Sequence, residues 1–207
     1  GDDLWTYRMM YQRTGNAVYL NRANAWARYF KQNYRACAGG DYASFCYDRD
    51  GYGADHLYGW GLLALHKQTG DTAALAEAIQ LGLLLESLYA PTSPFGCLPA
   101  GACTWYGFRQ SGRHLLFATR LAESTGDSRW AVLRDKIINL LLTSGQWDAA
   151  RGMYFYGDWS TDEIVGAGAY AAGARIVSPF EIGVFVEGLY QAYRVTGRVE
   201  TKNRLIA

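Results

Sequence analysis

Apolar residues recur at three- and four-residue spacing along most of the chain, and they do so in paired segments. In each pair an apolar or aromatic segment comes first, and a segment with a clearer amphipathic stripe follows it closely, as in residues 16–34 and 127–144. This period is that of a helix with one buried face rather than that of a strand. The pattern therefore predicts an all-α protein built from helical hairpins.

A Thr-Gly dipeptide separates the two segments of each pair. Glycine directly after a helix favours a left-handed C-cap, and an Asn or Asp after it can cap the next helix. Three of the dipeptides are followed by such a residue, namely Asn16, Asp71 and Asp127. The sequence thus predicts about four hairpins, the last with an incomplete second helix, whose turns contain Thr14, Thr69, Thr125 and Thr196.

Long loops connect the hairpins, over residues 35–52, 90–105 and 146–179. In the third loop, alternating aromatic residues predict a short β-hairpin near 152–160, and the Gly/Ala-rich tract 165–174 is expected to be exposed. Short turns at one end of the hairpins and long loops at the other make the two ends unequal. Because loops on a rigid scaffold usually carry function, we expect the site at the loop end.

This repeat resembles the (α/α) toroids, or six-hairpin glycosidases, of carbohydrate-active enzymes. The residues that carry the resemblance are the aromatic first helices, the TGN or TGD turns and outer helices such as AVYLNRANAWARYF. The resemblance implies one toroid-type domain over residues 1–207, with inner and outer helices and a sugar cleft at the start of the inner helices. Such toroids have five to seven hairpins. We therefore expect the chain to be a fragment of a longer one, or a partial toroid completed by self-association or by another chain.

Composition narrows the class of partner. The formal net charge of +1 provides no field that attracts nucleic acid or an acidic membrane, and no apolar run is long enough to span a membrane. The 16 Tyr, 7 Trp and 8 Phe combine apolar faces with polar groups, which suits both cores and sugar-binding surfaces. We expect an oligosaccharide or polysaccharide as the substrate.

The four cysteines form two close pairs, Cys37 with Cys46 and Cys97 with Cys103. A disulfide in each pair closes a short loop and stabilises the fold by roughly 2–3 kcal/mol. Disulfides persist in oxidising compartments, so these pairs predict a secreted or periplasmic protein. Free thiols are the alternative. Neither pair has the spacing of a zinc site, and no phosphate loop or HExxH motif is present, so we expect no metal and no cofactor.

The second inner helix, expected to begin at Asp55, has the richest first turn. Asp55 and Tyr58 are three residues apart and His56 and Trp60 are four apart, so each pair shares one face. A carboxyl group close to aromatic rings can have its pKa raised enough to act as a general acid. We predict that Asp55 and His56 are catalytic and that Tyr58 and Trp60 bind substrate. The alternative is an Asp N-cap beside a packed His.

Three further inner helices contribute candidates. Asp3 and Glu181 begin the first and fourth inner helices and are predicted as the second catalytic carboxylate, with helix caps or internal pairing as alternatives. In the third, two Arg residues four apart suit a carboxylate such as that of a uronic acid, with internal ion pairing as the alternative. The other predicted substrate-binding residues are aromatic, basic or histidine side chains: Trp5, Trp105, Tyr106, Arg109, Arg113 and His114.

These residues support three functions. The first is a glycoside hydrolase that uses two carboxylates across a cleft. The second is a polysaccharide lyase acting on a uronate, in which Arg neutralises the substrate carboxylate and a His or Tyr transfers the proton. The third is a non-catalytic helical scaffold or carbohydrate-binding repeat, since solenoid packing alone can account for the pattern. The hydrolase is the main prediction.

Overall fold

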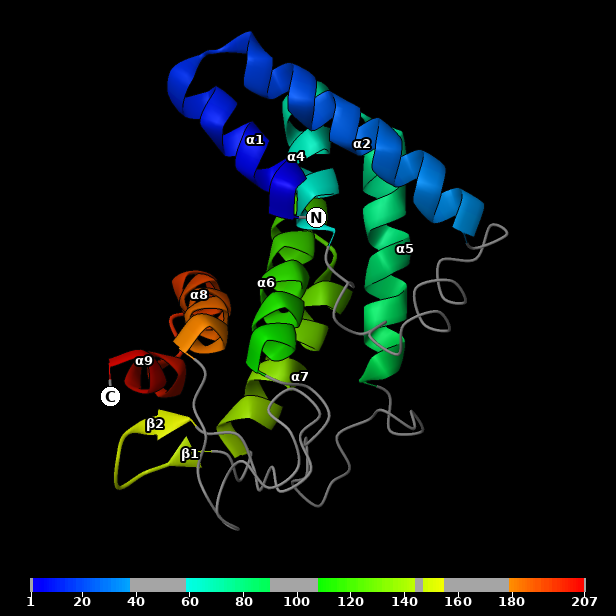
Figure 1. Ribbon diagram of the computed structural model, residues 1–207. Helices are drawn as coiled ribbons and strands as arrows, with labels where there is room; N and C mark the ends of the chain where they lie inside the picture. The colour runs from blue at the N-terminus through cyan, green and yellow to red at the C-terminus, as the bar shows by residue number, and fades with distance from the viewer. Residues whose placement is uncertain (1, 38–58, 90–107, 144–146, 155–178, 207) are drawn as a thin grey trace, which may run out of the picture. The chain divides into compact units, whose positions relative to one another are not determined.

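The computed structural model describes residues 2–37, 59–89, 108–143, 147–154 and 179–206 (Figure 1). It describes residues 2–4, 29–37, 88, 108–110, 148, 153 and 179–181 by their backbone only. Within the described residues the helices are α1 (Asp2–Thr14), α2 (Ala17–Cys37), α4 (Trp60–Thr69), α5 (Thr72–Leu88), α6 (Phe108–Thr125), α7 (Ser128–Thr143), α8 (Pro179–Thr196) and α9 (Val199–Ile206).

These helices form four consecutive hairpins, α1–α2, α4–α5, α6–α7 and α8–α9, which confirms the predicted all-α class and the helical-hairpin repeat. The first helix of each pair is called inner and the second outer, as in the sequence analysis. No helix in the described part of the chain is both long enough and apolar enough to cross a membrane.

The four Thr-Gly turns share one hydrogen-bond pattern. In each, the threonine hydroxyl donates to the carbonyl four residues earlier at 2.7–2.8 Å and accepts from the N–H two residues later at 3.1–3.3 Å. The glycine has a φ of +64° to +70° and donates its N–H to the carbonyl four residues before it at 2.7–3.0 Å. Because L side chains are strained in this left-handed conformation, the turn requires glycine.

The residue after the glycine starts the outer helix. The side-chain oxygens of Asn16, Asp71 and Asp127 accept from backbone N–H groups in the first turn of the next helix, at 3.0, 3.0 and 2.8 Å. These contacts satisfy donors that a helix start leaves unpaired and confirm the predicted caps. The fourth turn has Arg198 at this position, so α9 starts without an Asn or Asp cap.

A short antiparallel hairpin joins β1 (Trp147–Asp148) to β2 (Met153–Tyr154), with Trp147 opposite Tyr154. The predicted hairpin is therefore present, but its first strand lies before the range 152–160 in which it was expected. The reason is that the cross-strand partner of Tyr154 is Trp147, which precedes it in the chain. Their rings pack edge to face with centroids 4.9 Å apart. Residues 155–160 lie outside the described part.

The contacts of the chain divide it into two units, which are described separately. The first comprises Gly1–Leu88 and Phe117–Leu133. Its core contains apolar side chains from α4, α5, α6 and α7, among them Leu62, Leu81, Leu85, Phe117, Leu121 and Trp130. Two glycines allow close packing there: a Cβ on Gly59 would lie 2.7 Å from the Phe117 ring, and one on Gly82 would lie 2.6 Å from Leu121.

The second unit comprises Tyr89–Leu116 and Arg134–Ala207. Its core includes Leu115, Ile137, Ile138, Leu141, Tyr154, Phe185 and Leu189. Helices α6 and α8 approach each other at Gly112 and Gly188, where backbone meets backbone. A Cβ on Gly112 would lie 2.5 Å from the Phe185 Cα, and a Cβ on Gly188 would clash with the Gly112 carbonyl. The prediction that residues 1–207 form one domain stays a prediction.

Candidate functional site

Five of the predicted site residues lie outside the described part of the chain. They are Asp55, His56, Tyr58, Trp105 and Tyr106. One expectation about them is corrected, because α4 begins at Trp60 rather than at Asp55. The residue before it, Gly59, has φ −102° and ψ 17° and caps the helix without a side-chain hydrogen bond. Asp55 and His56 therefore do not belong to the first turn of α4, and their catalytic role stays a prediction.

The two other predicted carboxylates lie where the sequence analysis expected them. Asp3 lies in the first turn of α1 and Glu181 in the first turn of α8, both described by their backbone only. The first turn of a helix has free N–H groups and the positive end of the helix dipole, which favour a negatively charged carboxylate. This position suits a carboxylate that stays ionised, as a catalytic nucleophile or base does.

The half-buried ring of Trp5 lies on α1, two residues after Asp3. The guanidinium of Arg120 lies 5.7 Å from the ring centroid, a cation–π contact within the first unit. Arg120 also pairs with Glu123, with 3.0 Å between Nη1 and Oε2. Trp5 thus contacts a cation on α6, and its role in stacking a sugar stays a prediction.

Trp60 is the first residue of α4, and its side chain is buried. Burial of this large indole explains its presence as part of the core of the first unit. Arg113 on α6 is half-buried, and Arg109, its predicted partner four residues earlier, is described by its backbone only. Substrate binding by these three residues stays a prediction.

His114 is fully buried within the second unit, where it forms a pair that the sequence analysis did not anticipate. Its Nδ1 lies 2.9 Å from the Tyr89 hydroxyl, and the two rings are edge to face, with centroids 5.7 Å apart. Lys136 from α7 donates to the backbone carbonyl of Tyr89. Tyr89 directly follows α5 and lies 25 residues before His114 in the chain, so sequence spacing gave no sign that the two side chains meet.

Arg8 is the most deeply buried charged side chain described, and it was not predicted as important from the sequence. It is 1% exposed, donates from Nη1 to Gln68 Oε1 at 2.7 Å and from Nη2 to Asn24 Oδ1 at 2.5 Å. Burial lowers the pKa of Arg8, because neither amide partner compensates its charge. The sequence feature that could have indicated a buried charge is the position of Arg8 among the apolar residues of the segment before Thr14. Arg8 joins α1 to α2 and to α4, and so fixes the helix that carries Asp3.

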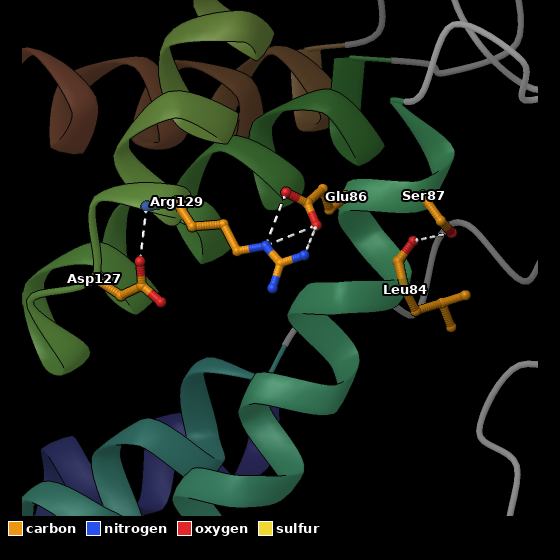
Figure 2. Close-up of polar contacts among 5 residues, drawn as sticks. All are labelled: Leu84, Glu86, Ser87, Asp127 and Arg129. Carbon is orange, nitrogen blue, oxygen red and sulfur yellow. Dashed lines mark hydrogen bonds and ion pairs between the residues drawn. The ribbon is translucent and has the colours of Figure 1, made fainter.

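The outer helices of the first unit are joined at the surface by an ion pair. Arg129 on α7 faces Glu86 on α5 (Figure 2). The Arg129 Nε lies 2.9–3.0 Å from both carboxylate oxygens, and Nη2 lies 2.9 Å from Oε2. The Asp127 cap accepts from the Arg129 backbone N–H in the same view. Hydrogen bonding to Glu86 raises the pKa of Arg129. Both side chains are exposed to solvent, at 51% for Arg129 and 36% for Glu86, so the pair is a surface contact between two outer helices.

Among the described residues, no group of three or more His, Cys, Asp or Glu side chains is arranged to hold a metal ion. Of the predicted disulfide cysteines, Cys37 is the last residue of α2, described by its backbone, and Cys46, Cys97 and Cys103 lie outside the described part.

Comparison with known proteins identifies the fold. No protein-family model matches the chain, and no curated protein matches it. Three solved structures do, all of the GH76A alpha-1,6-mannanase from Salegentibacter sp. HEL1_6. The unmodified enzyme is 16% identical, with a TM-score of 0.62 over 99% of this chain and 58% of that chain. An inactive variant in complex with alpha-1,6-mannotetrose is 17% identical, with a TM-score of 0.62 over 98% of this chain and 57% of that one.

The likeness extends over nearly the whole chain and confirms the predicted resemblance at the level of fold: the chain has an (α/α) toroid fold. At 16–17% identity it shows the fold alone. The chain spans 57–58% of the length of these structures. In the two ligand-bound variants, which are described as inactive, two consecutive aspartates are replaced by alanine or by asparagine.

Proposed function

We propose that the chain carries catalytic residues of a glycoside hydrolase that acts on an oligosaccharide or polysaccharide through two carboxylates. The observation that supports this most strongly is the fold, since 98–99% of the chain matches a mannan-degrading glycosidase. The chain spans little more than half of that enzyme, so the activity of the whole protein is part of the proposal.

The catalytic carboxylates are proposed to include the Asp2–Asp3 pair. Replacement of two consecutive aspartates accompanies inactivity in the variants of the similar enzyme. This chain has one Asp-Asp dipeptide, Asp2–Asp3, and it lies in the first turn of the inner helix α1. Asp55 and Glu181 are the other candidates for the second carboxylate.

Hydrolysis of the glycosidic bond requires the two carboxyl groups to be in different protonation states. One, protonated, donates to the oxygen of the glycosidic bond as it breaks, and the other, ionised, attacks the anomeric carbon or activates a water molecule. The N–H groups at the start of α1 favour the ionised role for a carboxylate there. Asp55, which stands in an aromatic stretch of sequence, is the candidate for the protonated role, with His56 beside it.

The aromatic residues of the prediction supply the sugar-binding surface. Trp5 stands beside the Asp2–Asp3 pair in sequence, and Tyr58, Trp105 and Tyr106 come shortly before α4 and α6. Aromatic faces stack on the C–H face of a sugar ring while the rim stays polar. An α-1,6-linked mannooligosaccharide is the first probe, because it is the ligand of the similar enzyme.

The test is hydrolysis of α-1,6-mannotetrose, measured as new reducing ends. We expect activity in the unchanged chain and a loss of about 10²-fold or more in Asp2→Asn with Asp3→Asn, as for removal of a catalytic acid or base. The matched control is Asp127→Asn, which alters an acid of similar type that also starts a helix but lies at a Thr-Gly turn. Full activity of the double variant would exclude Asp2–Asp3.

The same assay separates the alternatives. A lyase releases an unsaturated product that absorbs in the ultraviolet from a uronate polymer, and a binding protein retains the oligosaccharide without producing reducing ends. Either result in place of hydrolysis would overturn the proposed activity.

Export is proposed on separate grounds. The spacing of Cys37 with Cys46 and of Cys97 with Cys103 favours two local disulfides, which form in oxidising compartments. Mass spectrometry of the protein with and without reductant is expected to show the gain of four hydrogens on reduction of two disulfides. Four free thiols in the protein purified without reductant would contradict this.

A further inference from the structure

The inner helix α1 is held in the first unit by other means than the inner helix α4. Six consecutive residues of α4, Trp60–Leu65, are buried. On α1 the side chains of residues 5–14 are described, and Arg8 is the only one of them that is buried. The helix that carries Asp2–Asp3 therefore relies on a charged side chain where its neighbour relies on apolar packing.

The repeat itself does not require a charge at this position. Arg8 lies six residues before the threonine of its Thr-Gly turn, and the equivalent residues are Leu63 on α4 and Thr119 on α6. Both are buried, at 3% and 0% exposed, whereas Tyr190 at this position of α8 is exposed. An aliphatic or a short hydroxyl side chain thus fills the same buried position in two other hairpins.

Burial of Arg8 is unfavourable for stability. Nη1 donates to Gln68 Oε1 at 2.7 Å and Nη2 donates to Asn24 Oδ1 at 2.5 Å, but Nε has no acceptor within the described part of the chain. The ion pairs of the described residues do not include Arg8, and burial lowers its pKa. Because an apolar side chain avoids this desolvation, stability alone does not explain the presence of Arg8.

The two hydrogen bonds of Arg8 provide direction, which apolar packing lacks. A guanidinium presents its donors in a rigid planar fork, and the two acceptors belong to α2 and α4. Rotation of α1 about its axis would therefore strain at least one of these bonds. Two cation–π contacts oppose the same rotation. Arg22 of α2 lies 5.8 Å from the Tyr7 ring centroid, and Arg120 of α6 lies 5.7 Å from that of Trp5.

The rotation of α1 determines where its first turn points. A side chain reaches about 5–6 Å from the axis of a helix, so a rotation of about 20° moves its end by about 2 Å. Misplacement of a catalytic group by about 1 Å can lower the rate of reaction about 10²-fold. A small rotation that hardly changes the packing of α1 would thus remove most of the activity of a carboxylate on its first turn.

We propose that Arg8 is a positioning residue for the Asp2–Asp3 pair, a role that rests on the proposed function. It acts through α1, because its bonds to Gln68 and Asn24 hold this helix at the rotation in which the first turn presents the pair to the substrate. Arg8 itself does not contact the substrate, since it is 1% exposed. Its buried charge lowers stability and supports catalysis, a trade-off that is common at functional sites.

The first test compares Arg8→Met with the unchanged chain in hydrolysis of α-1,6-mannotetrose. Methionine is unbranched and apolar, so it fills the buried space without directed bonds. We expect kcat to fall at least about tenfold, because the carboxylates are misplaced. KM is expected to change by less than about twofold, because the interaction lost acts only in the transition state.

The matched control is Leu121→Val, which removes buried volume from the core of the same unit. We expect it to lower the midpoint of urea unfolding and to leave the kcat of the folded protein unchanged. Full kcat in Arg8→Met overturns the role of Arg8. An equal loss of kcat in Leu121→Val also overturns it, because general destabilisation would then be the cause.

A conservative variant separates charge from geometry. Arg8→Lys keeps the positive charge but has all its donors on one nitrogen, so it does not reproduce the planar fork between two acceptors. We expect it to lose kcat as Arg8→Met does. Full kcat in Arg8→Lys would show that the charge alone is sufficient and would exclude positioning through the two bonds.

Amide hydrogen exchange separates the role of Arg8 from the proposed function, because it needs no activity. We expect the amides of α1 to exchange faster in Arg8→Met than in the unchanged chain, and those of α5 to keep their rates. An unchanged chain that does not hydrolyse the mannotetrose overturns the proposed function. An active chain in which α1 exchanges at the same rate with and without Arg8 overturns the role of Arg8.

Discussion

Two helix junctions, one in each unit, hold inner helices by opposite physical means. In the first unit Arg8 places a charged side chain between α1, α2 and α4 and is held by the amides of Asn24 and Gln68. In the second unit Gly112 and Gly188 remove the side chains altogether, so that the backbones of α6 and α8 meet. A large polar side chain fills the first junction, whereas the second requires that neither glycine has a side chain.

The difference shows which kind of change each junction can accept. A buried guanidinium loses solvation and recovers part of it through directed hydrogen bonds, so its contribution depends on the two partners. A glycine contact depends only on shape, and its neighbours there are backbone atoms that cannot rotate away. We therefore expect the glycine junction to be the less tolerant of the two, and the predictions below test this order.

The largest effect is expected from Gly188→Ala. The new Cβ would clash with the backbone of Gly112, so α6 and α8 must separate, and we expect a loss of about 3 kcal/mol in the free energy of unfolding. The control is Gly183→Ala in the same helix, where a Cβ meets nothing within 4 Å and should stabilise by up to about 1 kcal/mol. Urea unfolding measures both, and equal values for the two variants would show that the close approach has no energetic weight.

Arg8→Ala is expected to lower the free energy of unfolding by about 2 kcal/mol, less than Gly188→Ala. The substitution removes a buried charge but leaves the oxygens of Asn24 and Gln68 without that donor. Arg13→Ala, at an exposed position on the same helix, is the control and should change stability little. If Arg8→Ala proves more damaging than Gly188→Ala in the same urea series, the order of the comparison is reversed.

A smaller effect, dependent on pH, is expected from Tyr154, whose ring lies 4.8 Å from that of Phe185 beside the glycine junction. Burial raises the pKa of Tyr154 to about 12, and Arg204 opposes this shift. Between pH 10 and 12 the unfolded chain loses this proton while the folded chain keeps it, so stability falls by about 1.4 kcal/mol per pH unit.

Tyr154→Phe removes this pH-dependent loss together with the hydrogen bond from the hydroxyl to the Leu141 carbonyl. Because the chain has 16 tyrosines, the informative quantity is the difference between the two proteins. Urea titrations at pH 9, 10 and 11 should show the stability of the unchanged protein falling more steeply than that of the variant. Parallel pH profiles would contradict the burial of Tyr154.

The smallest effect is expected from Glu86→Gln, which breaks the surface pair with Arg129 shown in Figure 2. Exposed ion pairs are screened by salt and add little to stability. Thermal melts should show a slight decrease at low salt that disappears at high salt. A decrease as large as that of Arg8→Ala would mean that a surface contact between outer helices matters as much as a buried junction between inner ones.

The repeat was predictable because its determinants are local. Each Thr-Gly turn is determined by a hydroxyl and a left-handed glycine, and three of the four also by an Asn or Asp cap, all within a few residues, so the four hairpins could be predicted along the chain. The partners of buried polar groups could not be predicted in this way. Arg8 meets Gln68, and Tyr89 meets His114, only after segments far apart in sequence have packed together. The start of α4 at Trp60 was also not predicted, because the apolar pattern continues across Gly59 and does not indicate that this residue caps the helix.

The self-contained turns have a consequence for how such a chain can change over generations. Each Thr-Gly turn draws its hydroxyl and glycine hydrogen bonds from within its own hairpin. Duplication or deletion of a gene segment that encodes one hairpin therefore leaves every other turn with all of its bonds. The chain can lengthen or shorten in whole hairpins, and only the faces that a lost or gained neighbour covers must adapt by substitution.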